Sequence, residues 1–98
     1  MKLFDGIADP AFLVVNRNGL AVAGDGLSLA AVGPFVETLH GALEKGETDY
    51  AVWSSGAKKY LGTAVNDCFL IVECGGTAPL TRLLYDLPAL RARCARCL

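Results

Sequence analysis

The order of the predicted secondary-structure elements constrains the fold of this chain more than any other feature. Short apolar runs separated by turn residues predict strands over residues 11–16, 20–23, 49–55, 58–65 and 68–74. Amphipathic periodicity predicts one helix over residues 28–45 and a second that begins near Leu80. The predicted order is therefore β-β-α-β-β-β-α. This order predicts an α/β fold, more narrowly of the α+β class, and few domains of this size share it.

Length and composition predict a single domain over residues 1–98. A chain of 98 residues buries only roughly 60–65% of its unfolded surface, so its core is modest. Its hydrophobic content of 53% is high for a soluble domain of this length. Part of the apolar excess is therefore expected to form a subunit interface.

Charge and hydropathy exclude several classes of function. The formal net charge of −1 predicts no binding of nucleic acid or anionic lipid. No apolar run approaches the roughly 20 residues that a membrane span needs. The start of the chain, residues 1–6, places Asp5 and Gly6 directly after Leu3 and Phe4, which is not the pattern of a signal peptide. We therefore expect a cytoplasmic protein.

The first predicted helix carries two apolar stripes. The stripe expected to face the core consists of Leu29, Val32, Val36, Leu39 and Leu43. A second, narrower stripe of mostly small residues consists of Ala31, Phe35, Thr38 and Ala42. Small residues would let another helix approach closely. Pro34 removes one backbone donor and is expected to kink this helix or delay its start.

Turn residues and one continuous apolar run indicate the layout of the strands. Asn18-Gly19 predicts a tight hairpin, since both residues tolerate a positive φ, and Asn66-Asp67 predicts a second tight turn. Residues 68–74 are nearly all apolar. Such a run is typical of a central strand that is covered on both faces.

The residues that commonly carry chemistry do not form a recognisable active site. Cys94 and Cys97 have C-x-x-C spacing, and Cys68 and Cys74 are expected on one strand face, which would suit a Cys₄ zinc site. The stronger interpretation is that Cys94 continues the apolar face of the last helix and is buried. His40 is expected on a solvated helix face, with no nucleophile at motif spacing beside it. We therefore predict no enzyme, no cofactor and no metal.

The sequence resembles the roadblock family, which includes dynein light chains and bacterial gliding-motility regulators. The resemblance lies in AFLVVNRNGLAVAGDG before a helix, then KKYLGTAVNDCFLIVEC before a closing helix, and covers about residues 10–90. It implies a roadblock/profilin-like fold, with a single antiparallel five-stranded sheet and helices on both sides. Family members usually begin with a longer N-terminal helix, whereas about nine residues precede the first strand here. One face of the sheet is therefore expected to be less covered, or covered by a partner.

The resemblance also implies a homodimer, or a dimer with a related roadblock chain, that binds a small Ras-like GTPase. Members of the family act as scaffolds or as activating partners and contribute no catalytic residue. Their third strands pair and their central helices lie side by side. Carried over by position, the interface consists of Tyr50, Val52, Trp53 and Ser54 on the strand, and Ala31, Phe35, Thr38 and Ala42 on the helix.

Two alternatives remain open. The first is a small-ligand sensory domain of the PAS or GAF type, which also arranges strands around a helical middle but normally has several short helices between its second and third strands. This chain offers one helix there and no internal polar cluster to orient a ligand. The second is a metal or redox switch that uses the four cysteines.

Overall fold

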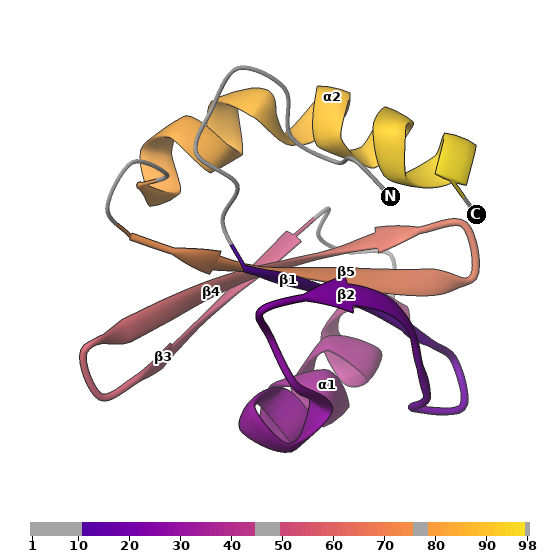
Figure 1. The fold of residues 1–98 in the computed structure, drawn as a ribbon, viewed down its shortest axis with the longest axis horizontal. Helices are drawn as coiled ribbons and strands as arrows, with labels where there is room; N and C mark the ends of the chain where they lie inside the picture. The colour runs from indigo at the N-terminus through magenta and orange to yellow at the C-terminus, as the bar shows by residue number, and fades with distance from the viewer. Residues whose placement is uncertain (1–10, 45–49, 76–78, 98) are drawn as a thin grey trace.

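Two helices cover the opposite faces of one antiparallel sheet in the computed structural model, which describes residues 11–44, 50–75 and 79–97. Figure 1 shows α1 on one side of the sheet and α2 on the other. The elements are β1 (Phe12–Asn16), β2 (Ala21–Asp25), α1 (Leu29–Glu44), β3 (Tyr50–Ser55), β4 (Lys58–Val65), β5 (Cys68–Cys74) and α2 (Leu80–Cys97). The predicted fold class and element order are confirmed.

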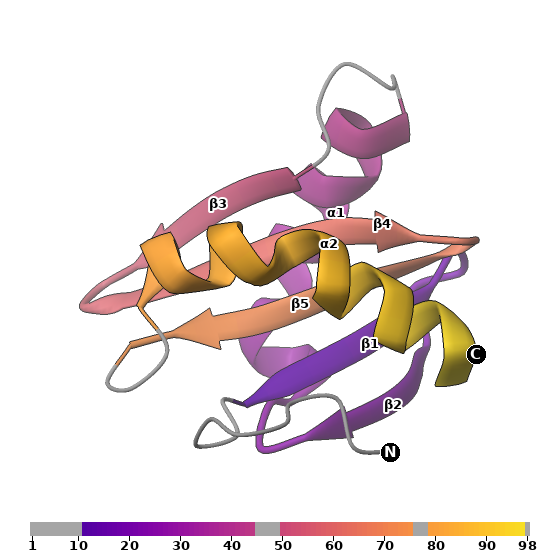
Figure 2. The same cartoon turned by 90° about the horizontal axis from the view of Figure 1, so that it is seen from above.

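The strands lie side by side in the order β2-β1-β5-β4-β3, and every neighbouring pair is antiparallel. β5 is therefore the central strand, as its continuous apolar run predicts. Its alternate residues enter two separate cores: Leu70 packs with α2, and Phe69 and Ile71 pack with α1. β2 and β3 form the two edges of the sheet (Figure 2).

The hairpin between β1 and β2 has a different turn from the one that the sequence predicts. The Gly19 amide donates to the Asn16 carbonyl at 3.0 Å, and the Asn16 side-chain oxygen accepts the amides of Asn18 and Leu20 at 2.9 and 3.0 Å. Gly19 has φ +82°, whereas Asn66 is the one non-glycine residue with positive φ in the described part of the chain. The expectation of a positive φ at Asn18 is therefore wrong. The loop has three residues, and glycine alone takes the left-handed position.

α1 begins at Leu29, one residue after the predicted start, and continues through Pro34. The Ser28 hydroxyl accepts the Ala31 amide at 3.4 Å, a long N-cap bond. Proline has no amide hydrogen to donate to the backbone carbonyl four residues before it. Because Pro34 is exposed, this carbonyl lies on the solvent side of the helix. The delayed start that Pro34 could have caused is therefore not observed.

The face of α1 that packs on the sheet is wider than the predicted core stripe. Val32, Val36 and Leu39 are buried, as predicted, and Leu29 is half-buried. Phe35 is also fully buried in the same core. The side chain of the remaining member of the stripe, at position 43, lies outside the described residues.

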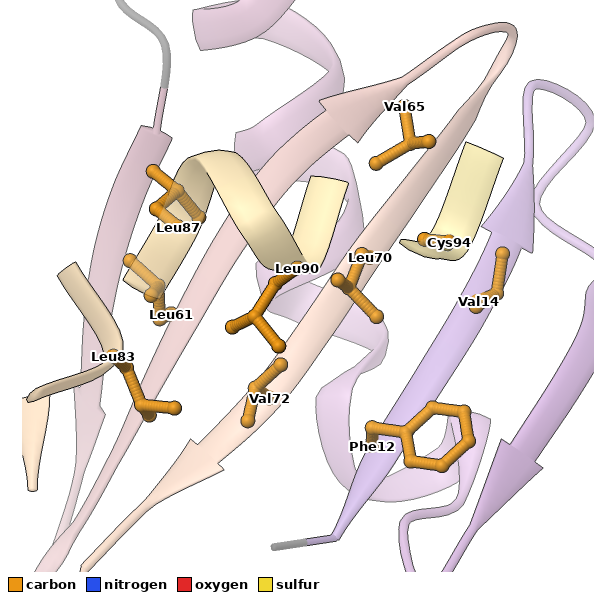
Figure 3. Packing of buried hydrophobic residues seen from close by; sticks show 10 residues of the cluster. All are labelled: Phe12, Val14, Leu61, Val65, Leu70, Val72, Leu83, Leu87, Leu90 and Cys94. Atoms are coloured by element: carbon orange, nitrogen blue, oxygen red, sulfur yellow. The ribbon is translucent and has the colours of Figure 1, made fainter. Parts of the chain in front are cut away.

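α2 packs across β4 and β5 and also continues through an exposed proline, Pro88. Its buried face consists of Leu83, Leu87, Leu90 and Cys94. Figure 3 shows Leu83 and Leu87 near Leu61 of β4, and Cys94 beside Val14 of β1. Cys94 has no exposed surface, so its predicted place in the core is confirmed.

Gly62 of β4 lets α1 lie close to the sheet. A β-carbon built at Gly62 would lie 2.6 Å from both terminal methyl carbons of Leu39, which is itself fully buried. Side-chain carbons do not approach so closely. The α1 layer therefore depends on the absence of a side chain at this position.

None of the described helices is long and apolar enough to cross a membrane.

Candidate interaction site

The open edge of β3 is the feature of this structure that most resembles an interaction site. One side of β3 pairs with β4 along its whole length, from Tyr50 opposite Thr63 to Ser55 opposite Lys58. Within the described residues, no strand pairs with its other side. An unpaired edge exposes a row of backbone donors and acceptors that another strand can use.

The hairpin geometry determines which backbone groups face that edge. Gly56, with φ +62°, and Ala57 connect β3 to β4. In a two-residue hairpin, the pair that closes the loop exchanges backbone hydrogen bonds, and the direction then alternates along the strand. The backbone groups of Tyr50, Val52 and Ser54 therefore point to the open edge.

Two apolar side chains at this edge are partly exposed. Tyr50 and Val52 are each 42% exposed. They lie opposite Thr63 and Leu61, so their side chains are on the α2 side of the sheet. Ser54 is also exposed. The edge therefore combines free backbone groups with apolar surface, which is the combination expected of a strand that pairs with a partner.

Trp53 lies in an aromatic stack inside its own chain. Its ring is stacked on Phe35 of α1 at a centroid distance of 5.4 Å and on Tyr60 of β4, also at 5.4 Å. Trp53 is half-buried, on the α1 side of the sheet. It therefore anchors α1 to the edge strand and leaves only part of its ring for a partner.

The four α1 residues predicted to contact a second helix are placed differently by the structure. Ala31 and Thr38 are exposed and Ala42 is half-buried. Phe35 has no exposed surface, so the prediction that it contacts a second chain is wrong. Each helical residue advances about 100° around the axis, which puts Phe35 inside the broad arc that faces the sheet.

The cysteines do not form the single zinc site that was considered. Cys68 and Cys74 do lie on one face of β5, against the α2 core. Six residues of strand separate them by about 20 Å, too far to bind one ion. Burial raises the pKa of the Cys74 thiol, and the nearby Lys59 charge opposes this only in part. The side chain of Cys97 lies outside the described residues, which contain no group of three or more potential metal ligands.

Two further side chains have contacts that the sequence does not predict. The His40 ring is half-buried and lies 5.6 Å from the ring of Phe69, rather than on a fully solvated face. The Arg91 Nε donates to the Ala64 carbonyl at 3.2 Å and so ties α2 to β4. No sequence signal identifies Ala64 as the partner, because the two residues are far apart in the chain.

Comparison with known proteins assigns no family to this chain. No protein-family model matches the sequence, and a search of curated proteins finds no match. A proposal about function therefore depends on the geometry of β3 and on the resemblance of the sequence to the roadblock pattern.

Proposed function

We propose that this chain is a non-enzymatic interaction module that self-associates by pairing β3 of one copy with β3 of a second copy or of a related chain. The observation that carries the proposal is the open edge of β3, where Tyr50 and Val52 are each 42% exposed. Antiparallel pairing would satisfy the outward backbone groups and join two five-stranded sheets into one.

The composition of β3 favours pairing with an identical strand. Tyr50–Ser55 contains no charged residue, so antiparallel pairing of two copies of β3 about a two-fold axis places no like charges opposite each other. The other edge differs. The β1–β2 register shifts between Val14 and Val15, and β2 ends in the charged Asp25. Bulges and charges protect an edge from pairing, so β3 is the favoured edge.

The position of α1 supports the same interface. α1 packs on β3 and β4, next to the edge. The arc of α1 beside Phe35, which stacks on Trp53 of β3, carries Ala31, Thr38 and Ala42. Small side chains on this flank would let the α1 helices of two copies lie close together. We therefore retain Ala31, Thr38 and Ala42 as proposed interface residues.

We assign the partner class from the resemblance to the roadblock family. The proposed partner is a small Ras-like GTPase, which the dimer would bind as a scaffold or regulator without contributing a catalytic residue. The proposed location is the cytoplasm. No specific observation favours the sensory-domain or cysteine-switch alternatives.

Substitution of Val52 tests the interface. We expect the wild-type protein to be a dimer by light scattering at micromolar concentration. Val52→Asp would bury a carboxylate in the interface between the two β3 strands. It should raise the dissociation constant of the dimer by at least about a hundredfold. Val22→Asp is the matched control, because Val22 is 50% exposed on the opposite edge strand, and it should leave the dimer intact.

A monomeric wild-type protein, or a Val52→Asp variant that remains dimeric, would contradict the β3 interface. The GTPase assignment is tested separately, with the dimer and Ras-like GTPases loaded with GDP or a non-hydrolysable GTP analogue. A preference for one nucleotide state supports a regulatory role. Absence of binding in both states contradicts the GTPase assignment and leaves self-association standing.

A further inference from the structure

The outer face of α2 is an apolar surface that no other element among the described residues covers. We define it by Tyr85, Pro88, Ala89 and Ala92, which are all exposed and recur at spacings of three and four along the helix. Tyr85 is 85% exposed, more than any other large hydrophobic residue described. An aromatic side chain held almost entirely in water by a regular helix contributes nothing to the core of this domain.

A hollow of about 350 Å³ lies beside this face. It is lined by Val65, Asn66, Pro88, Arg91, Ala92 and Ala95. The bond from the Arg91 Nε to the Ala64 carbonyl fixes the guanidinium at the wall of the hollow. The hollow therefore combines apolar side chains with the polar Asn66 and with one positive group held in place at its side. Its volume is large enough for an apolar side chain of a partner.

The two helices, which cover opposite faces of the sheet, differ in charge. α2 contains four arginines and one acidic residue, Asp86, so its formal charge is +3, although the chain as a whole has −1. Arg82 is paired with Asp86 at 3.0 Å. Two further arginines, Arg91 and Arg96, lie in the second half of the helix, on the side of the hollow and on the outer face. α1 contains two glutamates and no lysine or arginine. A partner of α2 is expected to be acidic.

We propose that the outer face of α2 and the adjacent hollow bind an acidic segment of a partner protein. An apolar side chain of that segment would pack against Tyr85 and enter the hollow, and its carboxylates would lie near Arg91 and Arg96. Tyrosine and arginine are the residues most typical of the centres of protein interfaces. A lipid surface fits less well, because one large apolar side chain beside a hollow is not the broad apolar face that such binding needs.

Two synthetic amphipathic peptides test this proposal. The two peptides have leucine at the same positions and differ only at their charged positions. One peptide carries glutamate at all of these positions, and the other carries lysine. Binding to the full chain is measured by fluorescence anisotropy. We expect the glutamate peptide to bind and the lysine peptide not to bind. The affinity for the glutamate peptide should fall as salt is raised.

Variants locate the binding surface. Tyr85→Ser should weaken binding of the glutamate peptide about tenfold, and Arg96→Gln about threefold with a smaller salt dependence. Both residues are exposed, so the fold is expected to persist. Lys58→Gln is the control and should change nothing, because Lys58 is exposed at the other end of β4 from the hollow and pairs with Glu73 on the α1 side of the sheet.

The proposal is overturned if the glutamate peptide does not bind, if the lysine peptide binds as well, or if Tyr85→Ser and Arg96→Gln have no effect. Binding to phosphatidylserine vesicles without binding to the glutamate peptide would also overturn it and assign the surface to lipid. Light scattering on the same samples distinguishes these outcomes from a failure of β3 pairing, which involves a different element.

Discussion

We expect Gly62→Ala to lower the free energy of unfolding by about 1–3 kcal/mol, and Gly62→Val to lower it further. The added β-carbon would lie 2.6 Å from both terminal methyl carbons of Leu39 and 3.0 Å from its Cγ. Leu39 is fully buried and cannot swing into solvent. The α1 layer would have to move away from the sheet. Urea unfolding in the Val52→Asp background measures the effect without the added stability of self-association.

A second glycine provides a control with the opposite sign. Gly41 lies on the exposed side of α1, and a β-carbon there would meet nothing within 4 Å. Gly41→Ala should therefore raise the free energy of unfolding by up to about 1 kcal/mol through helix propensity alone. If Gly62→Ala were as stabilising as Gly41→Ala, the close packing of Leu39 on the sheet would be contradicted.

Phe35→Ala should lower the free energy of unfolding by about 3–5 kcal/mol, the range typical of a buried phenylalanine. The substitution would leave a cavity between α1 and the sheet, and it would remove one of the two rings that stack on Trp53. Denaturant unfolding in the monomeric background measures the stability. The fluorescence of Trp53, the only tryptophan in the chain, reports the lost ring contact.

The size of this effect distinguishes a core residue from an interface residue. Phe35→Leu, which keeps most of the volume but removes the stacking, should cost less than about 1.5 kcal/mol. If Phe35→Ala dissociated the dimer but left the stability of the monomer unchanged, Phe35 would belong to the interface between chains, and the arrangement of α1 described above would be wrong.

The sequence was sufficient to predict the element order, the bounds of most strands and the central place of β5. These features depend on local signals. Strand alternation, the turn residues at Asn66-Asp67 and Gly56-Ala57, and the continuous apolar run of β5 are all readable over a few residues. The buried state of Cys94 was predictable for the same reason, since it continues the spacing of one helix face.

Features that depend on contacts between distant elements could not be predicted. The periodicity of α1 allows Phe35 to belong to either stripe. Its place in the core is shown only by its stack on Trp53, which in turn stacks on Tyr60. A glycine in a strand indicates a close approach or a bulge, but it does not identify Leu39 as the neighbour. Of the predicted interface, the resemblance to the roadblock family implied that Tyr50, Val52 and Ser54 lie on an edge strand. The structure adds that their backbone groups face outward.

The central claim, pairing through β3, is tested most directly by amide hydrogen exchange measured by NMR at two protein concentrations. The account predicts that the amides of Val52 and Ser54 are protected at high concentration and lose protection on dilution, because their partners are on the second chain. The amides of Ala51 and Trp53 face β4 and should remain protected at both concentrations. Fast exchange of Val52 and Ser54 at every concentration, in a protein that is dimeric by light scattering, would contradict it.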